Sequence, residues 1–213
     1  VWPANTQEIA AILRYAYENE IPVVPWSGGS SLEGNPVPVC GGIILAMYRL
    51  KEIIEVNEDD LQATVQPGIV YDDLNAHLRR LGLFFPPAPG SADVATLGGM
   101  VSNNSSGMHC GTELNTYATL DSLELVLASG SVLDTGAPDA DERLRATEPQ
   151  IYEGLLRLRD RVRGDQGPVA TIERLFAREL PINHALPPGR GPALGRSRGD
   201  RYFGGGAWYP GAA

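Results

Sequence analysis

The chain has 213 residues, of which 43% are hydrophobic and 20% charged, and its formal net charge is −9. This size and balance are typical of a globular protein with one domain or two small subdomains, and they allow a hydrophobic core. The negative charge argues against nucleic acid as the main partner, because an acidic chain repels a phosphate backbone. No apolar run approaches the ~18 residues of a membrane span, and no N-terminal signal peptide is visible.

The two cysteines, Cys40 and Cys110, are too few for a disulfide framework or a cysteine zinc site. Their number fits a reducing compartment, so we expect a cytoplasmic protein. His109 precedes Cys110, but adjacent side chains rarely point to one ion. We therefore expect no metal site.

The first half of the chain is predicted to alternate helices with short strands. Asn5 stands three residues before Glu8, which is capping-box spacing, although Thr6 could also cap the helix. Apolar residues at helical spacing follow up to Tyr17. Strands are expected at 22–25, 42–46, 53–57 and 61–66, the last two as a hairpin, and a helix at 70–80. The run from Pro86 to Pro89 excludes regular structure after that helix.

In the second half, residues 96–104 are rich in small and polar side chains. Strands are expected at 123–127 and 132–134, joined by a turn at 128–131. A helix over 150–162 has an apolar stripe of Ile151, Leu155, Leu158 and Val162. Pro168 is predicted to start another helix that runs toward Leu180.

Residues 181–213 form a different kind of segment. Eight glycines and five prolines occur there without a hydrophobic period, a composition that favours disorder. A GC-rich gene read out of frame yields mostly Gly, Pro, Ala and Arg, so one interpretation is a frameshifted or otherwise non-native end. A natural flexible linker is the alternative.

Residues 26–35, which we call the first glycine loop, carry the sharpest local motif, Trp-Ser-Gly-Gly-Ser-Ser-Leu-Glu-Gly-Asn. Small residues after a buried strand let backbone N–H groups approach an anion such as a diphosphate. A plain tight loop is the alternative. The motif is neither a P-loop nor the Rossmann pattern, and Pro36 and Pro38 oppose a helix. The anion would therefore be held by a loop rather than by a helix dipole.

Residues 89–107, which we call the second glycine stretch, pair two glycine sites with many short hydrogen-bonding side chains. Such a segment can wrap an extended polar ligand, and an ordinary irregular loop is the alternative. Two aromatic residues near the first glycine loop, Trp26 and Tyr48, either lie beside a ligand or pack in the core.

Together these stretches resemble the FAD-binding domain of the vanillyl-alcohol oxidase and p-cresol methylhydroxylase type, in particular D-lactate dehydrogenases and glycolate oxidase subunits. The resemblance covers about residues 1–180. It rests on motifs in the same order and spacing at 21–34, 65–70, 81–87, 95–100, 103–107 and 123–134. It implies an α+β fold of two lobes: about 1–60 with a small mixed sheet, and about 61–180 with a larger, mainly antiparallel sheet flanked by helices.

The resemblance implies that small residues of both stretches bind the pyrophosphate and ribityl region of FAD. The first glycine loop would contribute Ser27, Gly28, Gly29, Ser30, Ser31, Gly34 and Asn35. The second glycine stretch would contribute Thr96, Gly98, Gly99, Asn103, Ser106 and Gly107. Some relatives attach the flavin covalently through a histidine in the first loop; the matching position here is Ser30, so non-covalent FAD is predicted.

The implied activity is that of a FAD-dependent 2-hydroxyacid dehydrogenase or oxidase. Its substrate would be a small-molecule 2-hydroxy acid such as D-lactate or glycolate, and its electron acceptor a quinone or a cytochrome. Peripheral attachment at the inner membrane then becomes an alternative to a purely cytoplasmic location. Two other interpretations stay open: a non-catalytic remnant or flavin-carrying subunit that needs a partner, and a reductase of the same fold that acts on a cell-wall precursor.

The chain departs from the family pattern in two places. Where many relatives have an Arg-Tyr-Gly-like step, residues 110–117 read Cys-Gly-Thr-Glu-Leu-Asn-Thr-Tyr. The family's later glycine- and glutamate-containing FAD segment and its C-terminal cap domain have no counterpart. We therefore expect 1–180 to be an incomplete FAD-binding domain, and we name no catalytic residue.

Overall fold

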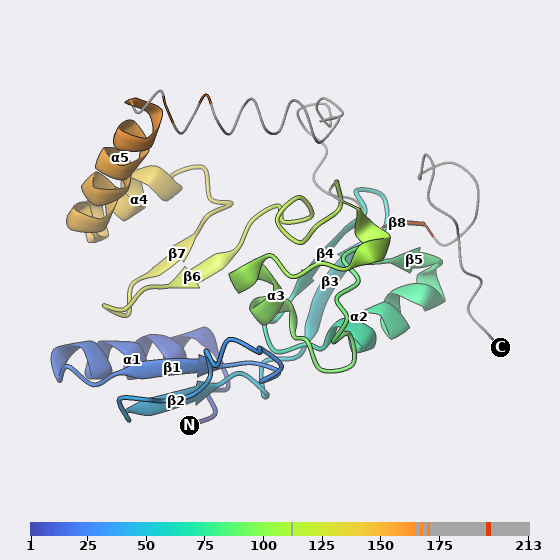
Figure 1. The fold of residues 1–213 in the computed structure, drawn as a ribbon, viewed down its shortest axis with the longest axis horizontal. Helices are drawn as coiled ribbons and strands as arrows, with labels where there is room; N and C mark the ends of the chain where they lie inside the picture. The colour runs from blue at the N-terminus through green and yellow to red at the C-terminus, as the bar shows by residue number, and fades with distance from the viewer. Residues whose placement is uncertain (112, 165–166, 168–169, 171–194, 197–213) are drawn as a thin grey trace.

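The computed structural model describes residues 1–111, 113–164, 167, 170 and 195–196 (Figure 1). Helices and short paired strands are mixed along the chain, so the predicted α+β class is confirmed. Except for residue 170, the predicted helix from Pro168 toward Leu180 lies outside the described residues, as does the segment 181–213 except for its residues 195–196. None of the described helices is both long and apolar enough to cross a bilayer.

The N-terminal elements are α1 (Thr6–Glu18), β1 (Val23–Trp26) and β2 (Ile43–Ala46). As predicted, Asn5 caps α1, and its Oδ1 accepts a hydrogen bond of 2.9 Å from the Glu8 N–H. β1 and β2 are parallel. Their carboxyl ends therefore meet at one edge, and the first glycine loop begins at that edge.

The next elements form the predicted hairpin and helix. They are β3 (Ile53–Asn57), β4 (Gln62–Val65), α2 (Tyr71–Leu78), the 3-10 turn η1 (Arg79–Leu81) and β5 (Leu83–Phe84). β3 and β4 pair antiparallel, and β5 pairs with β8 (Gly195–Arg196). In Figure 1 these elements, with α3 (Leu97–Asn103), lie apart from α1, β1 and β2.

The hydrophobic interior has two clusters. The first consists of Ile9, Leu45 and Leu50, with Val126 among the side chains packed against it. The second is larger and consists of Ile69, Tyr71, Leu74, Leu78, Leu83, Ala95, Leu97 and Met100. The second cluster lies beneath the second glycine stretch, because that stretch contributes Ala95, Leu97 and Met100 to it.

Buried polar groups of α2 fix the chain after β5. The Asn75 carbonyl oxygen accepts a bond of 2.8 Å from the Phe85 N–H, and the Tyr71 hydroxyl donates to the Phe85 carbonyl at 2.9 Å. Burial raises the pKa of Tyr71 to about 12, so its hydroxyl stays a donor at neutral pH.

A second hairpin, β6 (Glu124–Val126) and β7 (Val132–Asp134), was also predicted and lies along α1 in Figure 1. The Thr6 hydroxyl donates to Glu124 Oε1 at 2.6 Å and joins the start of α1 to β6. Although β6 and β7 come late in the chain, Val126 packs against the first hydrophobic cluster. β3, by contrast, packs against the second cluster. A division into lobes after about residue 60 stays a proposal.

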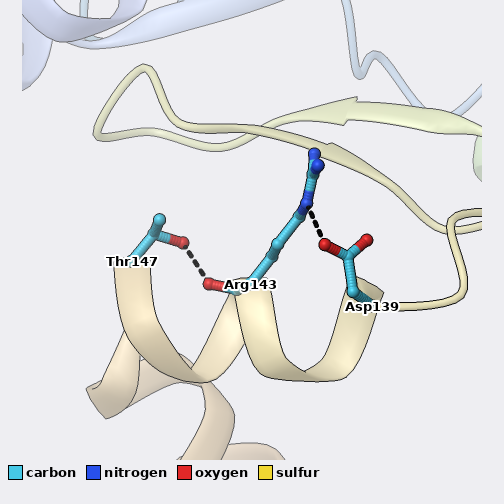
Figure 2. Close-up of polar contacts among 3 residues, drawn as sticks. All are labelled: Asp139, Arg143 and Thr147. Atoms are coloured by element: carbon cyan, nitrogen blue, oxygen red, sulfur yellow. Dashed lines mark hydrogen bonds and ion pairs between the residues drawn. The ribbon is translucent and has the colours of Figure 1, made fainter.

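Helix α4 (Ala140–Thr147) was not predicted, and it precedes α5 (Pro149–Gly164), which was. Figure 2 shows two polar contacts along α4. Asp139 pairs with Arg143 at 2.8 Å, and the Thr147 hydroxyl donates to the Arg143 carbonyl at 2.8 Å. The Arg143 hydrogen bond lowers the pKa of Asp139. The Asp139 and Arg143 side chains are more than half exposed, so the ion pair contributes little stability.

Between α4 and α5, Glu148 accepts hydrogen bonds from the hydroxyls of Ser129 and Ser131 in the β6–β7 turn. These bonds lower the pKa of Glu148 and connect the hairpin to the helical pair. The predicted apolar stripe of α5 is 40–52% exposed. In the described part of the chain, this stripe is therefore not a core face.

The sheets differ in size from what was expected. A small mixed sheet and a larger antiparallel one were anticipated, whereas each sheet among the described residues has two strands and the first is parallel. The strands are only two to five residues long and are separated by turns or helices. An isolated pair of short strands is only marginally stable in water, so each pair depends on packing against other elements.

Candidate ligand-binding site at the two glycine stretches

The first glycine loop contacts the second glycine stretch as soon as it leaves β1. A Cβ atom on Gly28 would lie 2.0 Å from the Val94 carbonyl oxygen, and one on Gly99 would lie 2.6 Å from Ser27 Oγ. Real Cβ atoms essentially never approach a neighbour within 3.0 Å. Two stretches that are distant in the sequence therefore meet side by side, and the missing side chains of Gly28 and Gly99 allow the contact.

The second glycine stretch is held in place by backbone bonds to the segment between β4 and α2. The Leu97 N–H donates to the Ile69 carbonyl at 2.9 Å, and the Gly98 N–H donates to the Pro67 carbonyl at 2.8 Å. Gly98 packs so closely on Pro67 that a Cβ would lie 2.7 Å from the proline Cβ. This docking positions residues 94–99 for the contact with Ser27 and Gly28.

Part of the second glycine stretch is helical, which the sequence did not predict. Thr96 is 2% exposed and caps α3, and its Oγ1 accepts from the Gly99 N–H at 3.4 Å. Two glycines in the first turn disfavour a helix intrinsically, by up to ~1 kcal/mol each relative to alanine. Burial of Leu97 and Met100, which are 7% and 1% exposed, favours the helix here.

The far end of the second glycine stretch is fixed by residues 115–117. The Asn104 side chain accepts a bond of 2.8 Å from the Tyr117 N–H, and the Thr116 hydroxyl donates to the Ser105 carbonyl. Asn103 Oδ1 accepts from the Ser105 hydroxyl at 2.5 Å. Residues 115–117 belong to the segment 110–117 that departs from the family pattern. Their structural role here is to hold the end of the second glycine stretch in place.

The first glycine loop presents a run of backbone N–H groups at the site. In the described part of the chain, the N–H groups of residues 27–31 donate to no protein acceptor. Gly29 and Ser30 are exposed, and Ser27, Gly28 and Ser31 are half-buried. Five consecutive free donors beside a buried segment are suited to an anionic ligand with several oxygens.

The charge pattern shows how such an anion would be bound. Neither 15–48 nor 81–142 contains a lysine or an arginine, so both glycine stretches lie in long segments without a cation. Within these two segments, backbone N–H dipoles and hydroxyl groups are the groups that can attract an anion. Among the described residues, no group of three or more His, Cys, Asp or Glu side chains is arranged to hold a metal ion.

The structure brings some of the predicted residues together and leaves others apart. Ser27 and Gly28 lie against the segment that contains Thr96, Gly98 and Gly99. Gly34 and Asn35 are exposed further along the first glycine loop. Asn103 is the last residue of α3, and Ser106 and Gly107 follow that helix. Gly107 packs against Ala88, where a Cβ would lie 1.6 Å from the carbonyl oxygen. The sequence analysis missed Val94 and Pro67, whose backbone contacts no motif reveals.

Comparisons with known proteins identify the family of the chain. Residues 1–136, more than half of the chain, match the family described as FAD binding domain. The chain belongs to the FAD-binding domain family. The predicted cofactor, FAD, is thereby confirmed, and the resemblance to flavin-dependent dehydrogenases is confirmed by named relatives.

This FAD-binding domain is similar to two curated proteins in particular. It is 38% identical to the glycolate oxidase subunit GlcD of Bacillus subtilis (strain 168) over 134 residues, which are 63% of this chain and 28% of that protein. It is 40% identical to a D-lactate dehydrogenase of Archaeoglobus fulgidus over 139 residues, which are 64% of this chain and 30% of that protein. The chain therefore spans less than a third of the length of these relatives.

Solved structures show the same fold at lower identity. An alkyldihydroxyacetonephosphate synthase matches with a TM-score of 0.59 at 24% identity, over 63% of this chain and 25% of its own. A p-cresol methylhydroxylase matches with a TM-score of 0.54 at 18% identity, over 66% of this chain and 28% of its own. At these identities the comparison concerns the fold alone.

The residues present fit the diphosphate of FAD. No described residue accepts a hydrogen bond from the N–H groups of 27–31, and a Cβ at Gly28 would displace the loop from Val94. A diphosphate offers several acceptor oxygens, and hydrogen bonds to a charged acceptor are stronger than neutral ones. The donors, the small side chains and the close contact between the stretches thus suit one nucleotide cofactor.

Proposed function

We propose that this chain is the FAD-binding portion of a flavin-dependent oxidoreductase that oxidises a small 2-hydroxy acid such as D-lactate or glycolate. The names of the two relatives support the substrate class. The observation that carries the proposal for this chain is the contact between Gly28 and Val94, which sets five unused N–H donors beside the second glycine stretch. An electron acceptor such as a quinone or a cytochrome is part of the proposal.

The chain's own residues bind and orient the cofactor. The first glycine loop donates backbone N–H groups to the diphosphate from Ser27, Gly28, Gly29, Ser30 and Ser31, and Gly34 and Asn35 close it. Thr96, Gly98 and Gly99 hold the second glycine stretch against the cofactor, and Asn103, Ser106 and Gly107 complete the contact. When bound, FAD supplies the redox chemistry by accepting two electrons from the substrate.

We infer that FAD is held non-covalently. The first glycine loop contains no histidine, and its Ser30 is exposed. Reconstitution of the full chain with FAD should give a yellow protein after gel filtration. Acid precipitation should then release the flavin into the supernatant. Flavin that stays in the precipitate would contradict this inference, and a folded, colourless protein would contradict FAD binding itself.

The second candidate is a non-catalytic or partner-dependent flavin carrier, which is favoured by the chain's coverage of less than a third of its relatives. Adding D-lactate or glycolate to the reconstituted protein under anaerobic conditions distinguishes the oxidoreductase from the flavin carrier. Loss of flavin absorbance with either acid supports an oxidoreductase that reacts on its own. Unchanged absorbance of bound FAD supports the carrier.

A further inference from the structure

An aromatic pair lies where β1 and β2 end, beside the first glycine loop. The indole Nε1–H of Trp26, the last residue of β1, donates to the hydroxyl oxygen of Tyr48. Trp26 stands opposite Ala46 in the sheet register, and Tyr48 follows two residues later. The hydrogen bond therefore joins the two parallel strands at the edge from which the loop departs.

Gly29 lies directly against this indole. A Cβ on Gly29 would be 2.7 Å from Cζ2 and 3.2 Å from Cε2 of Trp26, and its φ of +66° is left-handed. The loop backbone at Gly29 thus packs against the ring in a conformation that favours glycine. Gly29 is the central residue of the five that present unused N–H donors.

Packing in the core does not account for the pair. Neither Trp26 nor Tyr48 belongs to the two hydrophobic clusters of the described residues, and Tyr48 is 49% exposed. Among the described residues, no acceptor orients the donors of 27–31. Their orientation then depends on what the backbone packs against, and at Gly29 that is the indole.

We propose that Trp26 and Tyr48 are positioning residues for the diphosphate-binding loop. Tyr48 fixes the indole through the hydrogen bond, and the indole fixes the backbone at Gly29. The pair raises cofactor affinity by ordering the donors before the cofactor arrives. This inference rests on the proposed FAD-binding role of the first glycine loop.

Tyr48→Phe removes the acceptor of the bond and leaves the ring, so it is the first test. Its matched control is Tyr17→Phe, which removes the hydroxyl of a tyrosine on α1 that is 66% exposed. We expect Tyr48→Phe to weaken FAD binding by roughly threefold to tenfold, the effect of one lost hydrogen bond. The control should bind FAD like the wild type. Both variants should remain folded, and the loss of one hydrogen bond should lower the melting temperature of Tyr48→Phe by only a few degrees.

A second measurement needs no cofactor. In the ligand-free protein, NMR order parameters of the amides of 28–31 should be close to the rigid value of ~0.85 and fall toward ~0.6 in Tyr48→Phe but not in the control. Trp26→Phe should reproduce both effects. The double variant should be no weaker than Trp26→Phe alone, because the two residues share one hydrogen bond.

FAD affinity and the NMR order parameters together distinguish a failure of the positioning role from a failure of the proposed FAD binding. Wild-type affinity and wild-type order parameters in Tyr48→Phe would overturn the positioning role. Additive losses in the double variant would also overturn it. If the wild type bound no FAD, the proposed function would fail, and the order parameters alone would still decide whether the pair orders the loop.

Discussion

Gly28→Ala is expected to weaken FAD binding at least about tenfold and to lower the free energy of unfolding by about 1–3 kcal/mol. The new Cβ would lie 2.0 Å from the Val94 carbonyl oxygen, and that oxygen is backbone and cannot swing away. The first glycine loop must then move off the second glycine stretch and misplace its N–H donors. A hydrogen bond to a charged group contributes about 1.5–3 kcal/mol, so one lost donor is enough for this effect.

Gly90→Ala is the matched control, because a Cβ there meets nothing within 4 Å. Titration of FAD fluorescence and thermal unfolding measure both quantities for both variants. Equal affinity and equal stability of the two variants would show that the contact between Gly28 and Val94 does not hold the site together.

Leu78→Ala is expected to cost about 2–5 kcal/mol of unfolding free energy, a large share of the 5–15 kcal/mol typical of a domain. Leu78 is 0% exposed and lies in the second hydrophobic cluster with Ala95, Leu97 and Met100. Its truncation leaves a cavity under the second glycine stretch. Denaturant unfolding measures the loss.

The control for that prediction is Leu81→Ala, three residues later in η1, where the leucine is 38% exposed. Leu81→Ala should lower the free energy of unfolding by less than half as much as Leu78→Ala, because part of the Leu81 side chain already contacts water. Similar costs for the two truncations would mean that the second cluster is not the main core.

Elements with strong local patterns were predictable from the sequence. The helix after Asn5 has a capping residue and a regular apolar spacing, and the structure places α1 at Thr6–Glu18. The hairpin of β3 and β4 follows from two short β-rich segments around a polar turn at Asn57–Asp60. In both, neighbours in the sequence supply the interactions that decide the structure.

Elements that depend on distant contacts were not predictable. α3 contains Gly98 and Gly99, which disfavour a helix, and it forms because Leu97 and Met100 are buried against α2 and β5 side chains. None of the eight residues of α4 is buried, so no apolar periodicity in the sequence predicted this helix. The strands were located, but their arrangement as separate pairs depends on packing that a pattern of residues does not encode.

The same distinction holds at the site. Small residues indicated both glycine stretches, and the family resemblance indicated their shared cofactor. The contacts themselves, Gly28 with Val94 and Gly98 with Pro67, involve backbone atoms of residues with no distinctive chemistry. The hydrogen bond of Trp26 to Tyr48 likewise needed the strand register, since either aromatic residue alone fits a core position.

The most direct test is an NMR titration of the full, 15N-labelled chain with FAD, with ADP and with riboflavin, which lacks the diphosphate. FAD and ADP should shift the amide signals of 27–31, and riboflavin should leave them in place. Amide signals of 27–31 that stay unchanged while FAD binds elsewhere on the chain would contradict a diphosphate site at the first glycine loop.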